Sequence, residues 1–152
     1  MKIMWTDELS VGIPELDEQH RRLIDLLNEF YDAIERGDDE QGIRKLVEGL
    51  EEYTVFHFCA EEQFLIEINY PDLENHQKAH QILISEVRSA QARYQNGDRK
   101  AIRELSAFTL AWLYSHILKV DKKYGDYCKK CPFLNTDLIA KRSSNKCLGN
   151  AR

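Results

Sequence analysis

The sequence predicts an all-α protein that folds as an antiparallel up-down-up-down four-helix bundle, with an N-terminal arm and a short C-terminal tail. Three observations predict this fold. Only 3 prolines and 7 glycines interrupt the 152 residues, so long helix-forming stretches stay intact. Apolar residues recur at helical spacing in four successive segments. Short connections join these segments, which favours antiparallel packing of neighbours.

The first two helices are expected at residues 17–36 and 40–66. Asp17 can cap the first, and Gly37 ends its apolar pattern. The second must end before Pro71, because the residue ahead of a proline avoids helical backbone angles. These two segments would form one antiparallel pair.

The third helix is expected to follow a cap at Asp72 and to close at Gly97. The fourth can be capped by Asp98 and has Gly125 near its end. Residues 1–127 are therefore interpreted as one bundle domain with its arm. Residues 128–152 form the tail, of which 141–152 is polar enough to be frayed or disordered.

The composition bounds the classes of function. A hydrophobic content of 43% in 152 residues is enough for one substantial core. Residues 1–118 carry 12 basic and 23 acidic side chains, which argues against nucleic acid as the main partner. The tail is basic and could touch an acidic partner, but a solvated terminus is the favoured interpretation of its charge.

The compartment expected from the sequence is the cytoplasm. The first residues reach Asp7 and Glu8 without an apolar segment, so no secretory signal is expected, and no run approaches membrane-spanning length. The 4 cysteines are then expected to be reduced thiols, with Cys59 as a small packing residue. No membrane partner is expected.

Cys128 and Cys131 form a CxxC motif, which can indicate redox exchange or half of a zinc site. The context favours neither, because the motif is not preceded by a strand and lacks further ligands. A redox pair whose thiol pKa values are lowered by Lys129 and Lys130 stays open as an alternative.

All 5 histidines lie on the apolar stripes of the expected helices. A single histidine on such a stripe is more often a hydrogen-bonded core residue than a metal ligand. Five on converging stripes favour a metal site. Two of them, His76 and His80, are four residues apart, so both rings project from one helix face and can bind one ion.

Two carboxylates accompany these histidines. Glu61 follows His57 by four residues, and a buried carboxylate needs a cation beside it. Asp121 follows His116 by five residues, which corresponds to about 140° around an ideal helix. Asp121 can therefore reach the same ion only from the flank or through a distortion such as a π-bulge.

These residues resemble the motifs of the bacterial hemerythrins. The matching segments are LDEQH ending at His20, HFCAE from His57, HQKAH from His76 and HILKVD from His116. The arm around Trp5 is similar as well, so that the resemblance covers about residues 3–124. It implies a four-helix bundle that binds dioxygen reversibly at a non-haem di-iron centre, and that is not an enzyme.

The resemblance also implies the role of each ligand. One iron would be held by three histidines and the other by two, with two carboxylates and an oxo or hydroxo oxygen bridging them; the ligands are His76, His80 and His116, then His20 and His57, then Glu61 and Asp121. The second iron would keep an open position for dioxygen. Imidazole with carboxylate suits iron but does not exclude zinc or manganese.

A dry pocket over the open position is expected from Phe56, Trp112 and Leu113, which look like the apolar pocket of the family. Ordinary core packing explains each aromatic ring equally well. Two other functions stay open. The same ligands could serve a di-iron oxidoreductase acting on peroxide or nitric oxide, or an oxygen sensor acting through a partner.

Overall fold

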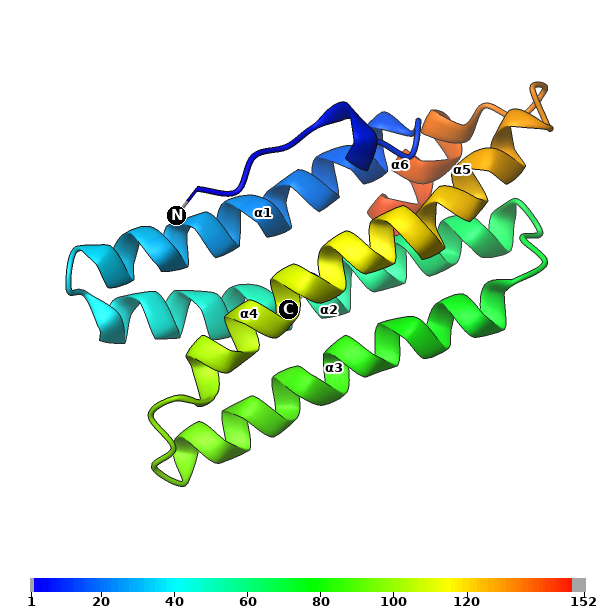
Figure 1. The fold of residues 1–152 in the computed structure, drawn as a ribbon. Coiled ribbons are helices and arrows are strands. Elements are labelled where there is room, and N and C mark those ends of the chain that lie inside the picture. The colour runs from blue at the N-terminus through cyan, green and yellow to red at the C-terminus, as the bar shows by residue number, and fades with distance from the viewer. Residues whose placement is uncertain (1, 149–152) are drawn as a thin grey trace.

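The computed structural model describes residues 2–148, and these residues contain helices but no strand. The bounds of the elements are η1 Asp7–Leu9, α1 Pro14–Glu35, α2 Asp39–Glu67, α3 Leu73–Gln95, α4 Ala101–His116, η2 Ile117–Asp121, α5 Lys122–Lys129 and α6 Thr136–Cys147. The long helices α1 to α4 run alternately up and down (Figure 1). The expected all-α antiparallel bundle is confirmed.

The core of the bundle is built from the apolar stripes of the four long helices. The side chains on these stripes are leucines above all, and the fully buried ones are Leu16, Leu23, Leu27, Leu46, Leu50, Leu65 and Leu83. Each amphipathic helix can bury its stripe only against its neighbours, so burial holds the four helices together. None of the helices in the described part of the chain is both long and apolar enough to cross a membrane.

The first long helix begins earlier than expected, at Pro14 instead of residue 17. Proline is well suited to a first helical position because its backbone angle is already helical. The predicted cap at Asp17 is therefore wrong. Its buried carboxylate instead accepts hydrogen bonds from the Val11 N–H, at 2.8 Å, and from the Ser10 hydroxyl, and so holds the arm.

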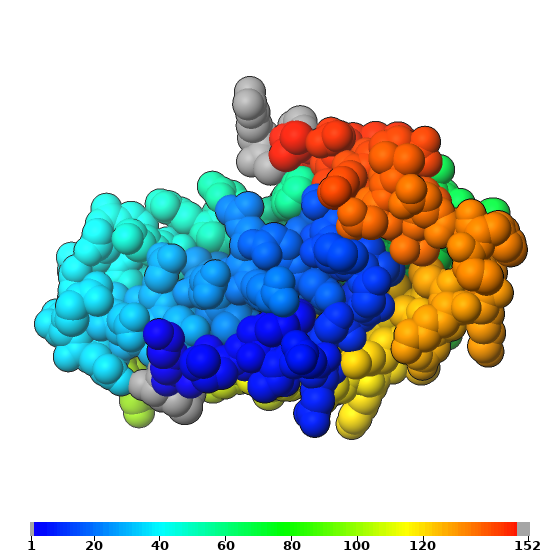
Figure 2. All heavy atoms as spheres, turned by 90° about the horizontal axis from the view of Figure 1, so that it is seen from above, coloured from blue at the N-terminus to red at the C-terminus, as the bar shows by residue number. Residues whose placement is uncertain are grey.

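The N-terminal arm lies along α1 (Figure 2). Asn28 fixes its start, because its side chain accepts from the Ile3 N–H at 2.7 Å and donates to the Ile3 carbonyl at 2.9 Å. Further along, Leu9 and Ile13 are almost fully buried. The arm is thus a part of the core, as well as the entrance to the bundle.

The fourth helical segment ends at Lys129, four residues beyond Gly125, which was expected near its end. The helical path continues through η2 into α5, and Gly125 lies inside α5. A Cβ atom at Gly125 would lie 2.6 Å from the Val11 carbonyl oxygen. Glycine is therefore present because the arm passes close to α5, and the position marks a backbone contact rather than a helix end.

The expectation of a frayed segment at residues 141–152 is wrong for 141–147, which belong to α6; residues 149–152 lie outside the described residues. Asn135 caps α6 by accepting from the Leu138 N–H at 3.2 Å. The helix packs on α2 and α1, and Ala140 and Cys147 are fully buried. Packing against the bundle stabilises a segment whose composition is too polar to predict it.

Cys59 of α2 and Cys147 of α6 form a disulfide, with their Cα atoms 5.9 Å apart. The expectation of four reduced thiols is therefore wrong for this pair, and so is the interpretation of Cys59 as a packing residue alone. The two positions are 88 residues apart in the chain. Only the docking of α6 on α2 brings them together, and no local pattern predicts that contact.

Candidate metal centre

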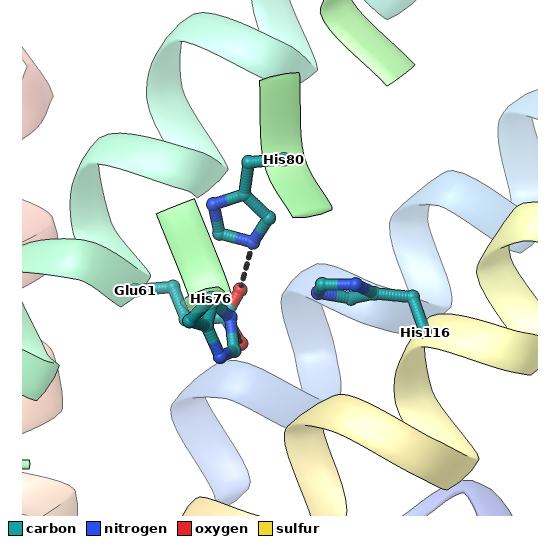
Figure 3. A group of neighbouring side chains, drawn as sticks. All are labelled: Glu61, His76, His80 and His116. Carbon is teal, nitrogen blue, oxygen red and sulfur yellow. Dashed lines mark ion pairs between the residues drawn. The ribbon is translucent and has the colours of Figure 1, made fainter. Parts of the chain in front are cut away.

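Seven side chains from all four long helices and η2 converge inside the bundle. None of them is more than 4% exposed; they are His20 of α1, His57 and Glu61 of α2, His76 and His80 of α3, His116 of α4 and Asp121 of η2. Figure 3 shows four of these side chains pointing toward a common centre. The structure thus places together every metal ligand that was expected from the sequence.

Glu61 lies between histidines of two helices. Its Oε2 atom is 3.0 Å from Nε2 of His57 and 3.3 Å from Nε2 of His80. Its other oxygen, Oε1, is 3.4 Å from Nε2 of His76. One carboxylate therefore faces imidazoles from both α2 and α3.

Asp121 reaches the centre because the chain forms a π-helical turn from Ile117 to Asp121. The wider turn rotates Asp121 onto the side of His116, and its Oδ1 atom lies 2.9 Å from Nε2 of His116. The distortion expected from the five-residue spacing is confirmed. The oxygens of Asp121 also face His76, at 3.3 Å from Oδ1, and His20, at 3.2 Å from Oδ2.

The donor atoms fall into two groups that share Glu61. Within each group the atoms lie within 4.8 Å of one another; the groups are Glu61 with His76, His80 and His116, and Glu61 with His20 and His57. Asp121 also spans both groups, because one of its oxygens faces His116 and the other faces His20. Two carboxylates thus stand between a three-histidine and a two-histidine position.

The inner polar atoms of the centre have no hydrogen-bond partner. They are Nε2 of His20, His76, His80 and His116 and all four oxygens of Glu61 and Asp121. Several of these atoms lie about 3 Å apart without hydrogen-bond geometry. Buried polar atoms in folded proteins are normally satisfied, and unsatisfied carboxylates are costly. Cations between these atoms would satisfy them, so the residues fit a pair of metal ions.

Hydrogen bonds on the outer side orient two of the rings. Nδ1 of His57 lies 2.6 Å from Oε1 of Gln19, and Nδ1 of His80 lies 2.8 Å from Oε1 of Glu62. An acceptor at Nδ1 keeps the proton there and leaves Nε2 free for a metal. Neither acceptor was predicted from the sequence. The available signal was their position, since each is the direct chain neighbour of a ligand.

The pKa values show how strongly the metal-free centre perturbs its own groups. Burial lowers the pKa of His57 to about 4. For His80, burial acts in the same direction, but the Glu61 and Glu62 carboxylates beside its two ring nitrogens outweigh it and raise its pKa to about 9. Burial would raise the pKa of Glu61, yet His76 and His57 hold it well below its usual range. The carboxylate is therefore ionised and available to a cation.

Aromatic rings cover the outer histidines. Phe58 lies 3.8 Å from the His80 ring, centroid to centroid, and parallel to it within 4°. Trp112 stacks on His116 at 4.2 Å. Phe58 was not predicted as a residue of the site, although it lies within the motif HFCAE. Leu113 is 1% exposed.

Phe56 lies instead in the wall of a surface hollow of about 510 Å³, together with Tyr53 and Gln19. The hollow also reaches His57. A dioxygen pocket formed by Phe56, Trp112 and Leu113 stays a prediction.

The CxxC motif has an environment that opposes a reactive thiolate. Cys128 and Cys131 are free cysteines at the C-terminal end of α5. Burial raises the pKa of the Cys128 thiol to about 11. The hypothesis that neighbouring lysines lower this pKa is therefore wrong, because burial and the nearby Cys131 thiol raise it instead.

Fold and site together define a class, the helical-bundle proteins that hold paired metal ions between histidines and carboxylates. The family model described as Hemerythrin HHE cation binding domain matches residues 11–128, and the chain belongs to the hemerythrin family. This family binds a di-iron centre. The resemblance seen in the sequence is confirmed.

Named relatives agree with this assignment. The chain is 32% identical to the bacteriohemerythrin of Stenotrophomonas maltophilia, over 84% of this chain and 82% of that protein. It is 33% identical to the bacteriohemerythrin of Clostridium acetobutylicum, over 81% of this chain and 98% of that protein. A crystal structure of a hemerythrin with a leucine-to-tyrosine substitution is similar with a TM-score of 0.69 and 26% identity, over 82% and 95% of the two chains.

Proposed function

We propose that this chain binds dioxygen reversibly at a di-iron centre, for storage, delivery or scavenging of oxygen. One observation carries the proposal: two buried carboxylates, Glu61 and Asp121, stand between a group of three histidines and a group of two. With one oxygen from each carboxylate, the three-histidine position has one protein donor more than the two-histidine position. The second position, beside His20 and His57, is therefore where we place dioxygen.

When bound, a pair of ferrous irons supplies the electrons that make dioxygen binding possible. The residues of the chain provide the setting. Gln19 and Glu62 hold the rings of His57 and His80 in the tautomer that presents Nε2 inward. Phe58, buried and stacked on the His80 ring, keeps water away from the outer face of that ring. Exclusion of water supports reversible release, because protons assist the irreversible loss of reduced oxygen.

We further propose that the protein is not an enzyme. An enzyme acting on peroxide or nitric oxide needs a proton donor at the centre. The tyrosines nearest to the ligands are Tyr53, stacked on His57 at 4.7 Å, and Tyr124, at 5.7 Å from the His76 ring. Burial raises the pKa of both phenols well above the usual value, so they are poor acids at neutral pH. The histidine-rich ligand set also favours binding over oxygenase chemistry.

As its compartment we propose the cytoplasm. The Cys59–Cys147 disulfide is unusual there, because thiols in that compartment are kept reduced. Cytoplasmic disulfides are mostly transient, catalytic or redox-sensing. A disulfide between Cys59 and Cys147 that forms and breaks reversibly is consistent with the observed bond and with the proposed compartment.

The test is anaerobic reconstitution with ferrous iron, a count of iron per chain, and visible absorption spectra in air and again after removal of oxygen. We expect about two irons per chain and a charge-transfer band that disappears when oxygen is removed. Turnover of added peroxide, or rapid irreversible oxidation, would support the oxidoreductase instead. Less than one iron per chain would contradict the metal assignment altogether.

A further inference from the structure

We propose that Cys59 and Cys147 are a thiol–disulfide exchange site, whose redox state controls how α6 holds the outer side of His57. The disulfide connects α2, which carries His57, with α6, which follows the residues matched by the family. α6 thus lies outside the residues that the family model covers. Figure 2 shows this segment lying over α1 and α2 at the surface.

A continuous chain of contacts joins α6 to the metal centre. The Ser144 hydroxyl accepts a hydrogen bond from Nε2 of Gln19 at 2.8 Å. The same amide's Oε1 accepts from Nδ1 of His57 at 2.6 Å. Ser144 precedes Cys147 by three residues, and Cys59 follows His57 by two. The contacts therefore run from His57 through Gln19 and Ser144 to α6, and the disulfide connects α6 back to α2 beside His57.

Close packing on α2 and α1 holds α6, but few large apolar side chains take part in it. Its buried side chains are all small, namely Ala140, Ser143, Ser144 and Cys147. Small side chains remove little apolar area from water, and a helix of 12 residues is marginal without packing. Polar contacts at the surface, such as Lys146 with Glu67 at 2.6 Å, are screened by solvent. The covalent bond therefore adds a strong restraint to this packing.

The exchange needs a cellular dithiol as reductant. Its thiolate attacks Sγ of Cys59, the partly exposed partner, while Cys147 is fully buried and leaves as a thiolate that takes up a proton. The second thiol of the reductant then displaces Cys59 from the mixed disulfide. The reductant ends as a disulfide and the protein gains two thiols. The reaction reverses with a disulfide oxidant of the same class.

Release of α6 changes the surroundings of His57 in two ways. Gln19 loses Ser144, the nearer of its two acceptors, and keeps only Glu15 at 3.4 Å, so its hold on the His57 ring becomes looser. Leu148, next to Cys147, lines the hollow that reaches His57, so the hollow becomes wider. Any effect of these changes on iron held by His57 rests on the proposed function, whereas the thiol–disulfide exchange itself does not.

The first experiment uses metal-free protein. Hydrogen–deuterium exchange is compared for the oxidised chain and the chain reduced by dithiothreitol and alkylated. We expect the amides of residues 136–147 to exchange at least about tenfold faster after reduction, while those of α3 do not change. Cys147→Ser should exchange fast without reductant. Cys131→Ser, which removes a free thiol, is the matched control and should keep the response. Unchanged exchange in the α6 amides on reduction, or no disulfide in the mass spectrum, overturns the proposal.

The second experiment measures the affinity for Co²⁺ by titration, which requires no oxygen binding. Reduction, Cys147→Ser and Ser144→Ala are each expected to weaken binding at the second position about tenfold, the typical effect of losing an outer hydrogen bond. Cys59→Ser serves if Cys147→Ser does not fold. Weaker Co²⁺ binding in Ser144→Ala but equal binding before and after reduction would contradict control by the disulfide. Failure of the oxygen carrier would appear separately, as Co²⁺ binding without reversible oxygenation.

Discussion

Asp121 and His116 form a close pair, 2.9 Å apart at Oδ1 and Nε2, although five residues separate them along the chain. The π-helical turn of η2 is the reason, since a regular α-helix would point the two side chains about 140° apart. The same turn directs the second oxygen of Asp121 to His20, 3.2 Å away on another helix. A local irregularity of the backbone thus completes a centre that spans the bundle.

The substitution Asp121→Asn tests the bridging role. It keeps the shape of the side chain but replaces an anionic donor by a neutral one, which binds a hard cation more weakly. We expect iron per chain to fall from about two to about one under equal conditions. Asp126→Asn, at an exposed position of the following helix, is the control and should bind iron as the natural chain does. Full loading of Asp121→Asn would contradict the bridging role.

The stability of the metal-free protein should be greatest near pH 6.5, where both imidazoles titrate in the unfolded chain. The folded pKa of His80 is raised to about 9, so its contribution is complete below 6.5 and is lost as the pH rises toward 9. The folded pKa of His57 is lowered to about 4, so its contribution exists above 6.5 and is lost as the pH falls toward 4. Urea unfolding across this range measures the profile.

Glu62→Gln separates the two limbs of this profile. The Glu62 carboxylate accepts from Nδ1 of His80, and it is one of the groups that raise the pKa of that imidazole. Without its charge the folded pKa of His80 falls, so the alkaline loss of stability should be smaller and complete at a lower pH, while the acidic limb, due to His57, should stay in place. A profile that shifts on both sides would show that the two limbs do not belong to these residues.

Phe58→Ala should both destabilise the protein and shorten the lifetime of its oxygenated form. Phe58 is 3% exposed and stacks on His80, and loss of a buried phenylalanine costs about 3–5 kcal/mol. The cavity would also admit water next to the ligand. Phe133→Ala, at a side chain that is 83% exposed, should change stability by less than about 0.5 kcal/mol. The measurements are thermal unfolding and the rate of autoxidation. Equal rates of autoxidation in both variants would show that Phe58 does not keep water away from the centre.

Gly125→Ala should loosen the N-terminal arm. The new Cβ would lie 2.6 Å from the Val11 carbonyl oxygen, a backbone atom that cannot rotate away. We expect a loss of about 1–3 kcal/mol and faster hydrogen exchange in the arm. Lys123→Ala, at an exposed position of the same helix, controls for the effect of alanine in α5. If Gly125→Ala keeps full stability, the arm and α5 can move apart at little cost in free energy.

Much of the fold and of the candidate site could be predicted because the signals were local. A pair such as His76 and His80 shares one helix face whatever surrounds it. The distortion before Asp121 followed from a spacing that a regular helix does not satisfy. Phe58 was within reach of the same reasoning, since it lies beside His57 in the motif. Gln19 and Glu62 were harder, because polar residues next to ligands are usually exposed to solvent.

The sequence by itself determined the four amphipathic helices and the seven candidate ligands, because helical periodicity decides which side chains share a face. Three features were decided only by the tertiary structure. They are the formation of the disulfide, the folding of the polar C-terminal segment as helix α6, and the close approach of the arm to Gly125. Each of these depends on a contact between segments far apart in the chain. Such a contact forms through the packing of the whole bundle, and composition or spacing within one segment carries no record of it.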